Sequence, residues 1–340
     1  MIEMEMPEKR LEMVHLQLTR MCNLNCHFCG QWGDKGFFAN CGPGEMTLTE
    51  WKQVVDSIWH YGTEAGKLPL ITLWGGEPLL YPEFDDIVHY LRARAFELAV
   101  ITNGVLLDRY DELIRSEFSA VYVSIDGPKA IHDSIRGKGV FRQAVGNIEK
   151  LKNANPKIFL MTTICPQNIE VLPELPYLFD SLGVDKVLLH ELICLNSREL
   201  ADYKSWLRSS FGLDATKIDS WHAELPPDYQ NRKNEKLAEM FRRLGVSPAK
   251  TPVEYLPHGI AEQENYCLSP FRHLHVAWDG GVLFCTDFYD FSAGNVRNKD
   301  LIDIWRGEDA ENFRREIMLR RCPACSHCSW QRNREYSFEN

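Results

Sequence analysis

Three cysteines near the N-terminus are spaced closely enough to bind one metal centre. They are Cys22, Cys26 and Cys29, within the segment C-N-L-N-C-H-F-C at 22–29. In a long chain, thiols at such short spacing indicate metal ligation or redox chemistry rather than disulfides. A [4Fe-4S] cube has four irons, so three thiolates leave one iron open to a ligand from outside the protein. A structural zinc ion is the alternative, with His27 as a candidate fourth ligand inside the loop.

A second group of cysteines lies in the last quarter of the chain. Its members are Cys267, Cys285, Cys322, Cys325 and Cys328. Four thiolates close a [4Fe-4S] cluster, so the group is sufficient for one cluster with one thiol left over. The first three are the surer ligands, and Cys325 and Cys328 compete for the fourth position. The alternative is a zinc knuckle in which His327 takes part.

Glycines and polar residues stand where several apolar runs end. The glycines of W-G-G-E-P let another backbone approach closely, and the glutamate can accept a hydrogen bond from an ammonium group. The serine of S-I-D-G offers a hydroxyl and the arginine of I-H-D-S-I-R-G a guanidinium, and both can hydrogen-bond to a polar ligand. Taken singly, these residues are also explained as a cap, a strand-end turn or a surface charge. With the asparagine of T-N-G, the set is Gly75, Gly76, Glu77, Asn103, Ser124 and Arg136.

The apolar runs before these residues predict the elements that position them. Short runs rich in β-branched residues alternate with helical patterns, which is typical of parallel βαβ units. The clearest helix is expected at 47–61, opened by the capping box T-L-T-E. We predict an α/β fold, a partial (β/α)6 parallel TIM-like barrel, with the polar residues at the carboxyl ends of its strands. The expected strands are 13–19, 68–75, 97–103, 120–126, 157–164 and 186–192.

The rest of the chain differs in character from this repeating part. We expect the barrel at 8–197, a helical bridge or cap at 198–260, and a small cysteine-rich domain at 261–335. The D-G-G turn at 279–281, between two apolar runs, predicts a β-hairpin in the small domain.

Composition limits the kinds of partner. The chain has 340 residues and a formal net charge of −10. Nucleic-acid binding depends on clustered Lys and Arg, so we expect no nucleic-acid partner. No apolar run approaches the ~18 residues that span a membrane, and the N-terminus has no basic segment leading into an apolar one. We therefore expect a cytoplasmic protein with no membrane partner.

The spacing C-x3-C-x2-C after the first strand, with Phe28 before the last cysteine, resembles the signature of radical S-adenosylmethionine (SAM) enzymes. The G-G-E segment, Ser124 and Arg136 stand in the order seen in the branch that includes anaerobic sulfatase-maturating enzymes. The resemblance implies a [4Fe-4S] cluster on the first three cysteines and an electron donor of the flavodoxin or ferredoxin type. It also implies S-adenosyl-L-methionine bound by Phe28, Gly75, Gly76, Glu77, Asn103, Ser124 and Arg136.

The cysteine-rich tail is similar to a shortened auxiliary-cluster domain of this superfamily. The G-x4-C segment at 280–285 and the later G-N-V and I-W pairs resemble a SPASM domain reduced to its twitch form. That resemblance implies one auxiliary [4Fe-4S] cluster, held by four of the five cysteines of the tail.

Three further residues are candidates for catalysis. Cys165 and Cys194 follow the fifth and sixth strands, where a thiol could donate a hydrogen atom to a substrate radical. Both are also explained as small buried hydrophobic residues. Asp287 is a candidate proton acceptor, although it stands two residues after Cys285, whereas the family places its aspartate directly after the matching cysteine.

The resemblance implies a 5'-deoxyadenosyl radical that abstracts hydrogen from a substrate C–H bond. An auxiliary cluster can accept an electron, which favours dehydrogenation of a small sugar-like or aminocyclitol substrate. Modification of a peptide, as in RiPP or sulfatase maturation, and epimerisation are alternatives. A strand beginning by residue 13 leaves no room for a leader-binding domain, which weakens the peptide alternative. A non-catalytic electron carrier is least favoured, because a carrier needs no nucleotide pocket.

Overall fold

The computed structural model describes residues 6–41, 44–152, 154–258, 267–285, 287–319 and 322–328. Its described residues form one ten-stranded sheet in the order β10-β9-β8-β1-β2-β3-β4-β5-β6-β7. All six strands expected from the sequence are present and pair in parallel. They are β1 (Met13–Thr19), β2 (Leu70–Gly75), β3 (Leu98–Thr102), β4 (Ala120–Ser124), β5 (Lys157–Ile164) and β6 (Lys186–Glu191).

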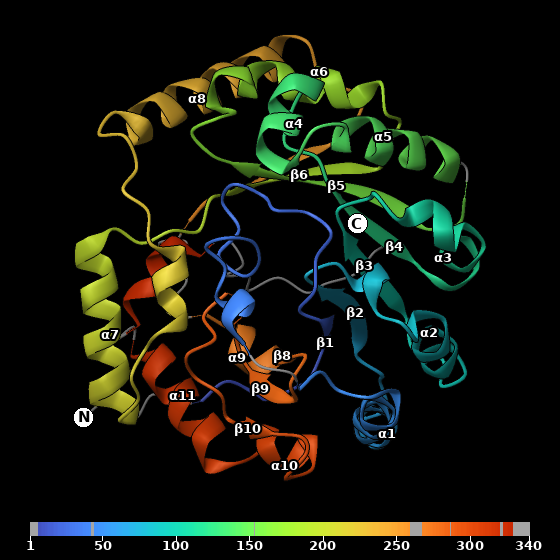
Figure 1. Ribbon diagram of the computed structural model, residues 1–340, viewed down its shortest axis with the longest axis vertical. Helices are drawn as coiled ribbons and strands as arrows, with labels where there is room; N and C mark the ends of the chain where they lie inside the picture. The colour runs from blue at the N-terminus through green and yellow to red at the C-terminus, as the bar shows by residue number, and fades with distance from the viewer. Residues whose placement is uncertain are drawn as a thin grey trace.

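The sheet curves like a barrel that does not close. Strand β7 (Val253–Leu256) pairs in parallel with β6 and ends the sheet on one side. On the other side β8 (His273–Val276) pairs in parallel with β1. Figure 1 shows the strands bending around the blue loop that follows β1. The prediction of a partial parallel barrel is confirmed, and β7 is an addition that the sequence analysis missed.

The small domain continues the same sheet. Strands β8 and β9 (Gly281–Leu283) are antiparallel, with Val276 opposite Val282, so the hairpin predicted at the D-G-G turn is confirmed. Strand β10 (Gly294–Asn295) pairs antiparallel with β9 and forms the edge of the sheet. The hairpin with the auxiliary cysteines is thus joined to the barrel through backbone hydrogen bonds between β1 and β8.

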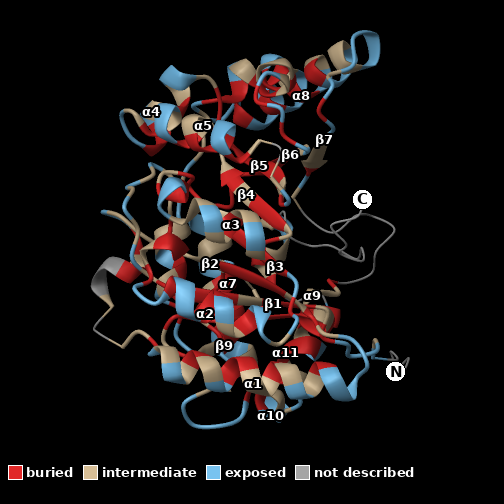
Figure 2. Ribbon diagram, turned by 90° about the vertical axis from the view of Figure 1, so that its right-hand side faces the viewer, coloured by how far each residue is buried: buried red, intermediate tan, exposed pale blue. Residues whose placement is uncertain are grey.

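Helices cover the outer face of the sheet (Figures 1 and 2). They lie over strand residues with no exposed surface, such as Val14, Leu16 and Leu18 of β1. The α-helices are α1 (Leu48–Glu64), α2 (Phe84–Arg92), α3 (Asp111–Glu117), α4 (Lys129–Arg136), α5 (Val140–Leu151), α6 (Leu175–Asp180), α7 (Ser197–Phe211), α8 (Tyr229–Val246), α9 (Ser269–Arg272), α10 (Leu301–Trp305) and α11 (Glu308–Met318). Six short 3-10 segments lie between these elements in the described residues: η1 (Phe37–Asn40), η2 (Pro78–Leu80), η3 (Leu107–Tyr110), η4 (Ile169–Glu174), η5 (Lys217–Trp221) and η6 (Pro323–His327).

Helix α1 forms where the sequence predicts a helix, and for the predicted reason. The Thr47 hydroxyl accepts a hydrogen bond from the Glu50 backbone N–H at 3.3 Å. In return the Glu50 carboxylate accepts from the Thr47 N–H at 2.7 Å, which completes the capping box. Trp51, Val55 and Ile58 share one face of the helix and are fully buried against the sheet.

The inner face of the sheet is more open than the outer face. Side chains alternate along a strand, so the residues between the buried outer ones point into the barrel. Several of these inner residues keep part of their surface accessible, which means that the curved sheet surrounds a hollow. They include His15 of β1, Trp74 of β2, Ile101 of β3, Tyr122 and Ser124 of β4, and His190 of β6.

Among the described residues, no helix combines the length and the apolar character that crossing a membrane requires.

Candidate active site

The three cysteines of the first group lie together on the loop after β1. Burial raises the pKa of Cys22 to about 12, and the charges of Cys26 and Cys29 add to this shift. The pKa of Cys26 rises to about 11 for the same main reason, and Cys29 contributes again. Each thiol of the group therefore lies within electrostatic range of the others, as ligands of one centre must.

The G-G-E segment packs directly against the start of this loop. The Gly76 N–H donates to the Thr19 carbonyl at 2.9 Å, and the Glu77 N–H donates to the Met21 carbonyl at 2.8 Å. A Cβ atom added to Gly76 would lie 2.3 Å from the Met21 oxygen and 2.4 Å from the Arg20 oxygen. Glycine is thus required for the backbone to approach the cysteine loop so closely.

Glu77 is held inside the protein by its own hydrogen bonds. Its side chain has no exposed surface, and its carboxylate accepts from the Thr102 hydroxyl at 2.7 Å and the Asn103 N–H at 2.8 Å. The Leu79 N–H donates to it as well, at 3.3 Å. Burial outweighs these donors and raises the pKa of Glu77 to about 7. Glu77 thus fixes the end of β2 to the end of β3, and its Oε2 atom, which accepts one of these bonds, still has capacity for a further donor.

Asn103 connects the end of β3 to the cysteine loop. Its side-chain amide donates to the Asn23 side-chain oxygen at 2.8 Å and lies 4.0 Å from the Cys22 sulfur. Its own amide oxygen accepts from the Val105 N–H at 3.0 Å. Asn103, a predicted SAM contact, therefore also orients a predicted ligand of the cluster.

Arg136 lies beside the cysteine loop, at the end of α4. Its Nη1 atom is 3.9 Å from the Cys26 sulfur, and the guanidinium carbon is 5.7 Å from the centre of the Phe28 ring. Its Nε donates to the Asp126 carboxylate at 2.5 Å. Ser124, at the end of β4, stands two residues before Asp126 and keeps part of its surface accessible on the inner face. The residues of S-I-D-G and Arg136 are therefore neighbours in space, as the resemblance requires.

Asp126 is a site residue that the sequence analysis did not single out. It has no exposed surface, and besides Arg136 it accepts a hydrogen bond from the Thr163 N–H at 3.0 Å. Its own N–H donates to the His132 Nδ1 at 3.1 Å, and its carbonyl accepts from Asn168 at 3.0 Å. The signal was the aspartate of S-I-D-G, which precedes Arg136 by ten residues.

Cys165 and Cys194 lie near the same loop. Both belong to one buried apolar cluster with Ile135 and Leu192, and Phe28 packs against that cluster. Burial raises the pKa of Cys165 to about 12 and that of Cys194 to about 11. Both side chains therefore keep their S–H bond near neutral pH. Their role as hydrogen-atom donors stays a prediction.

The five cysteines of the tail also come together. Burial raises the pKa of Cys285 well above its ordinary value, and Cys325, Cys328 and Cys267 contribute. The pKa of Cys325 is raised chiefly by a hydrogen bond with Cys322. The tail thus has one thiol more than a four-thiolate cluster needs, and either Cys325 or Cys328 can be the fourth ligand.

The zinc alternatives fit this geometry less well. The His327 Nε2 lies 3.2 Å from the Glu199 carboxylate, so its imidazole is engaged by α7. Two groups of buried or half-buried thiols, one of three and one of five, suit one open and one closed iron-sulfur cluster.

Asp287 lies close to Cys285 and Tyr289. Its charge contributes to the raised pKa of Cys285 and to that of Tyr289, both of which are raised mainly by burial. Tyr289 packs with Trp74 and Phe38 in an aromatic cluster that joins the two parts of the chain. Asp287 thus lies near one auxiliary cysteine, and its role as a base stays a prediction.

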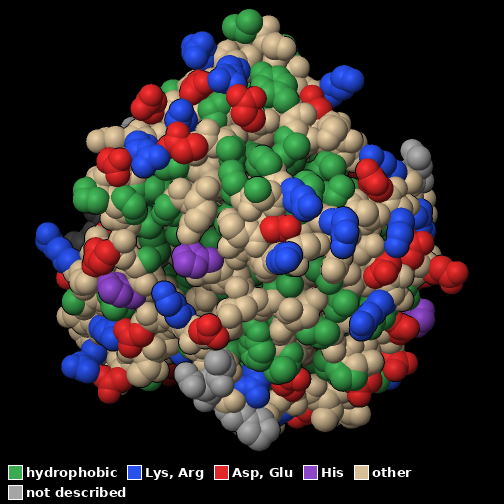
Figure 3. Space-filling view, turned by 45° about the horizontal axis from the view of Figure 1, so that its top comes forward, with side chains coloured by type: hydrophobic (Ala, Val, Ile, Leu, Met, Phe, Trp, Pro, Cys, Tyr) green, Lys and Arg blue, Asp and Glu red, His purple; other side chains and the backbone are tan. Residues whose placement is uncertain are grey.

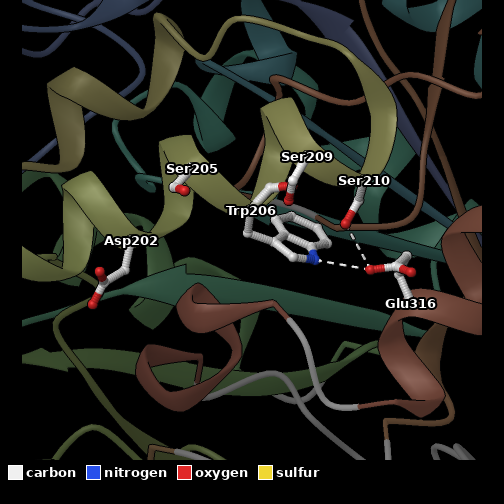
Figure 4. A pocket seen from close by; sticks show the side chains of 6 residues that line it. All are labelled: Asp202, Ser205, Trp206, Ser209, Ser210 and Glu316. Atoms are coloured by element: carbon white, nitrogen blue, oxygen red, sulfur yellow. Dashed lines mark hydrogen bonds between the residues drawn. The ribbon is translucent and has the colours of Figure 1, made fainter.

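A separate surface pocket lies between α7 and α11 (Figure 4). There the Trp206 indole N–H and the Ser210 hydroxyl donate to the Glu316 carboxylate at 3.2 and 2.7 Å. None of the predicted site residues lines this pocket. Figure 3 shows acidic and basic side chains interspersed over one face of the molecule, without a broad basic patch there.

Comparison with known proteins agrees with this geometry. The family model of the radical SAM superfamily matches residues 16–175, and that of an iron-sulfur cluster-binding domain, SPASM, matches residues 267–329. The pre-heme d1 synthase of Dinoroseobacter shibae is 31% identical over 91% of this chain and 78% of its own length. Two Methanosarcina barkeri proteins are also similar: an AdoMet-dependent heme synthase (28% identity, 94% of this chain and 91% of that protein) and an Fe-coproporphyrin III synthase (26%, 92% and 79%).

Solved structures share the fold. The enzyme anSMEcpe with bound AdoMet has a TM-score of 0.68 at 16% identity, covering 91% of this chain and 81% of that one. SuiB of Streptococcus suis bound to its precursor peptide SuiA has a TM-score of 0.66 at 14% identity, covering 94% and 71%. The chain is therefore an enzyme with a radical SAM [4Fe-4S] cluster, S-adenosylmethionine and an auxiliary cluster as cofactors. The protein belongs to the radical SAM superfamily and carries a C-terminal SPASM domain.

Proposed function

We propose that this enzyme modifies a tetrapyrrole, a haem precursor or an iron porphyrin, at a C–H bond of a side chain. The proposal takes its substrate class from three relatives that match more than nine-tenths of this chain and are named for haem, pre-haem d1 or Fe-coproporphyrin. No relative reported above is named for a sugar or an aminocyclitol. The small sugar-like substrate expected from the sequence therefore has no support among them.

The accessible inner face of the sheet is the structural observation that carries the proposal. Its side chains include flat rings suited to a planar macrocycle. The His15 and His275 imidazoles stack with their centroids 4.3 Å apart, and Trp74 meets His275 edge-on at 6.2 Å. Farther round the sheet, Tyr122 and His190 face the same hollow.

Different residues of the chain have different roles in the proposed reaction. When bound, the radical cluster and S-adenosylmethionine supply hydrogen-atom abstraction from an unactivated C–H bond. Arg136 holds a positive charge beside Cys26 and suits the methionine carboxylate. The apolar cluster around Cys165 and Phe28 excludes water from the same place. The auxiliary thiols would hold a centre that accepts an electron, and Asp287 would accept a proton.

Turnover with defined substrates tests this proposal. The enzyme is reconstituted anaerobically with iron and sulfide, and iron is counted, with about eight per chain expected for two four-iron clusters. It is then given dithionite, S-adenosylmethionine and one of three substrates: iron coproporphyrin III, an aminocyclitol or a cysteine-containing peptide. We expect 5'-deoxyadenosine to form fastest with the porphyrin, together with a porphyrin product of changed mass.

Two results would contradict the proposal. Stimulation by the peptide alone would favour the peptide-modifying alternative, which the likeness in fold to SuiB leaves open. Stimulation by the aminocyclitol alone would restore the substrate first expected from the sequence. A Cys22→Ala, Cys26→Ala, Cys29→Ala variant is the matched control, because it should keep about four irons in the tail and form no 5'-deoxyadenosine.

A further inference from the structure

Several buried polar atoms inside the barrel have no hydrogen-bond partner among the described residues. They are both side-chain polar atoms of Gln17, the indole nitrogen of Trp74, the Nδ1 atom of His275 and the hydroxyl of Tyr289. Gln17 has no exposed surface, and His275 and Tyr289 are each 4% exposed. Buried polar groups in folded proteins are nearly always paired, so five such atoms need an explanation.

These atoms belong to one patch rather than to scattered positions. Gln17 and Trp74 are opposite each other in the pairing of β1 with β2. Trp74 meets the His275 ring at 6.2 Å and packs in the same aromatic cluster as Tyr289. Gln17 lies close to the Tyr289 hydroxyl and lowers its pKa as a hydrogen-bond donor would, against the larger opposite effect of burial, but the two side chains do not reach hydrogen-bonding geometry. The unpaired atoms of three strands and the loop after β9 therefore face each other.

The chemistry of the patch favours a ligand that accepts hydrogen bonds. An indole N–H donates only, the glutamine amide carries two donor hydrogens, and a phenol O–H donates readily. Burial, Asp287 and Asp279 raise the pKa of Tyr289, so the phenol keeps its proton. Arg20 brings positive charge to the edge of the patch, because its guanidinium lies 4.8 Å from the Trp278 ring centre and its buried Nε is unpaired. Donors with a cation beside them suit a carboxylate.

The patch also lies between the two cysteine groups. Trp74 directly precedes Gly75 and Gly76, and Gly76 packs on the loop of the first group. Tyr289 follows Cys285 by four residues. Trp74 keeps part of its surface accessible, so the patch opens on the hollow of the barrel rather than on the outer helices. A group bound here would be covered by both parts of the protein.

We propose that Gln17, Trp74 and Tyr289 bind a carboxylate of the substrate, with Arg20 balancing its charge. The inference rests on the proposed tetrapyrrole function, because tetrapyrrole precursors carry several carboxylate side chains around a flat ring. Holding one of them between the two iron-sulfur sites would fix which side chain faces the reacting end of S-adenosylmethionine. The three residues are thus specificity-determining residues of the site.

Binding of two matched probes tests the assignment. The reconstituted enzyme is titrated with coproporphyrin III and with its tetraamide, which has the same ring but no carboxylate, and binding is followed by porphyrin absorbance. We expect the wild type to bind the acid at least about tenfold more tightly than the amide. Tyr289→Phe and Trp74→Phe should each weaken binding of the acid by about fivefold to tenfold and leave binding of the amide within about twofold.

Each variant has an internal check on folding. Tyr289→Phe removes an unpaired buried hydroxyl, so its melting temperature without ligand should equal or exceed that of the wild type. Trp59→Phe, on α1, is the matched control for loss of an indole outside the barrel and should bind both probes like the wild type.

The outcomes separate the two proposals. If the wild type prefers the acid and the variants keep that preference, the carboxylate binds elsewhere and the patch holds only water, while the tetrapyrrole function stands. If the wild type binds acid and amide equally, the patch again fails and the function stands. If the wild type binds neither porphyrin, the proposed function and the inference that rests on it are both overturned.

Discussion

At the scale of single residues, the site depends on how one buried cation is held. Arg136 is 9% exposed, and its guanidinium is shared between the Asp126 carboxylate and the Cys26 sulfur. Asp126 raises the pKa of Arg136 despite burial, so the arginine stays charged. Asp126 in turn is fixed by the Thr163 N–H and by Asn168. Asp126 is therefore a positioning residue for a predicted cofactor contact.

Replacing Asp126 tests this positioning role. In Asp126→Asn the neutral amide offers one acceptor oxygen instead of two, so Arg136 loses its fixed orientation and its paired charge. We expect S-adenosylmethionine to bind roughly tenfold more weakly, measured by equilibrium dialysis against the reconstituted enzyme, with the iron content unchanged. Glu117→Gln, which breaks the exposed pair with Arg92, is the control and should leave binding unchanged. Unaltered affinity in Asp126→Asn would show that Arg136 needs no such support.

Gly76 makes a second prediction at this scale. A methyl group there would overlap the carbonyls of Arg20 and Met21, which are backbone atoms and cannot move without moving the cysteine loop. We expect Gly76→Ala to lose the radical cluster and retain the auxiliary one, so that iron falls from about eight to about four per chain. Gly146→Ala is the matched control, since nothing lies within 4 Å of its Cβ position and alanine favours the helix. Full iron content in Gly76→Ala would contradict the packing argument.

At the scale of elements, α8 is attached to the edge of the sheet by a buried ion pair. Lys233 of α8 is 1% exposed and pairs with the Glu191 carboxylate at the end of β6. Tyr255 of β7 donates to the same carboxylate, and the His258 imidazole lies 3.5 Å from it. Glu191 therefore joins β6, β7 and α8 at the carboxyl end of the barrel.

Breaking this pair should destabilise the protein more than removing it entirely. In Lys233→Met the Glu191 carboxylate stays buried without its cation, which typically costs about 3 to 5 kcal/mol of unfolding free energy. The double variant Lys233→Met, Glu191→Leu should recover most of that loss, because no buried charge remains. Urea unfolding followed by far-UV circular dichroism measures both. Arg232→Met, which removes an exposed partner of Glu170, should change the unfolding free energy by less than about 1 kcal/mol.

The sequence predicts the individual strands and helices of this fold better than it predicts which strands pair with each other. The six strands and α1 were predicted because long β-branched runs and a capping box are local signals. Strand β7 was missed, since V-E-Y-L is four residues long and follows a proline. Met13 of β1 pairs with His273 of β8, which lies 260 residues later in the chain. Neither strand's own sequence indicates this pairing. The single sheet that joins both cysteine groups could not be read from the sequence.

The same limit applies to the candidate site. The cysteine spacings and the strand-end motifs are local, so these residues were found before the structure was known. Gln17 and Tyr289 were not, because a glutamine in an alternating strand and a tyrosine in a loop are ordinary in sequence. Only the fold brings them together with Trp74, inside the barrel and without partners. Such residues stand out only because their buried polar atoms have no hydrogen-bond partners, and tertiary structure alone shows this.

At the scale of the whole molecule, the continuous sheet places both iron-sulfur sites around one hollow. The first lies on the loop after β1, and the second includes Cys267 before and Cys285 after the hairpin that pairs with β1. Burial is the chief reason why the pKa is lowered in five histidines: His15, His132, His190, His258 and His275. The enclosed architecture thus keeps several imidazoles neutral at once.

These neutral histidines predict that the fold loses stability in mild acid. Burial lowers the pKa of His132 to about 4 and that of His275 to about 3. An unfolded histidine titrates near 6.5, so below that pH the unfolded chain binds more protons than the folded one. The stability that depends on these groups is therefore complete above pH 6.5 and falls as the pH drops toward 4. Each of the two should account for about 1 kcal/mol lost between pH 7.5 and pH 5.5.

Urea unfolding at pH 7.5 and pH 5.5 measures the effect, with iron counted at both values so that cluster loss is separated from loss of the fold. We expect His132→Gln to reduce the pH-dependent loss by about 1 kcal/mol, since the glutamine cannot take up a proton and its side-chain oxygen can still accept from the Asp126 N–H. His60→Gln, at an exposed position on α1, should leave the loss as large as in the wild type. Equal losses in all three proteins would mean that the acid sensitivity arises outside the buried histidines, because His132 would then be protonated in the folded and unfolded chain alike.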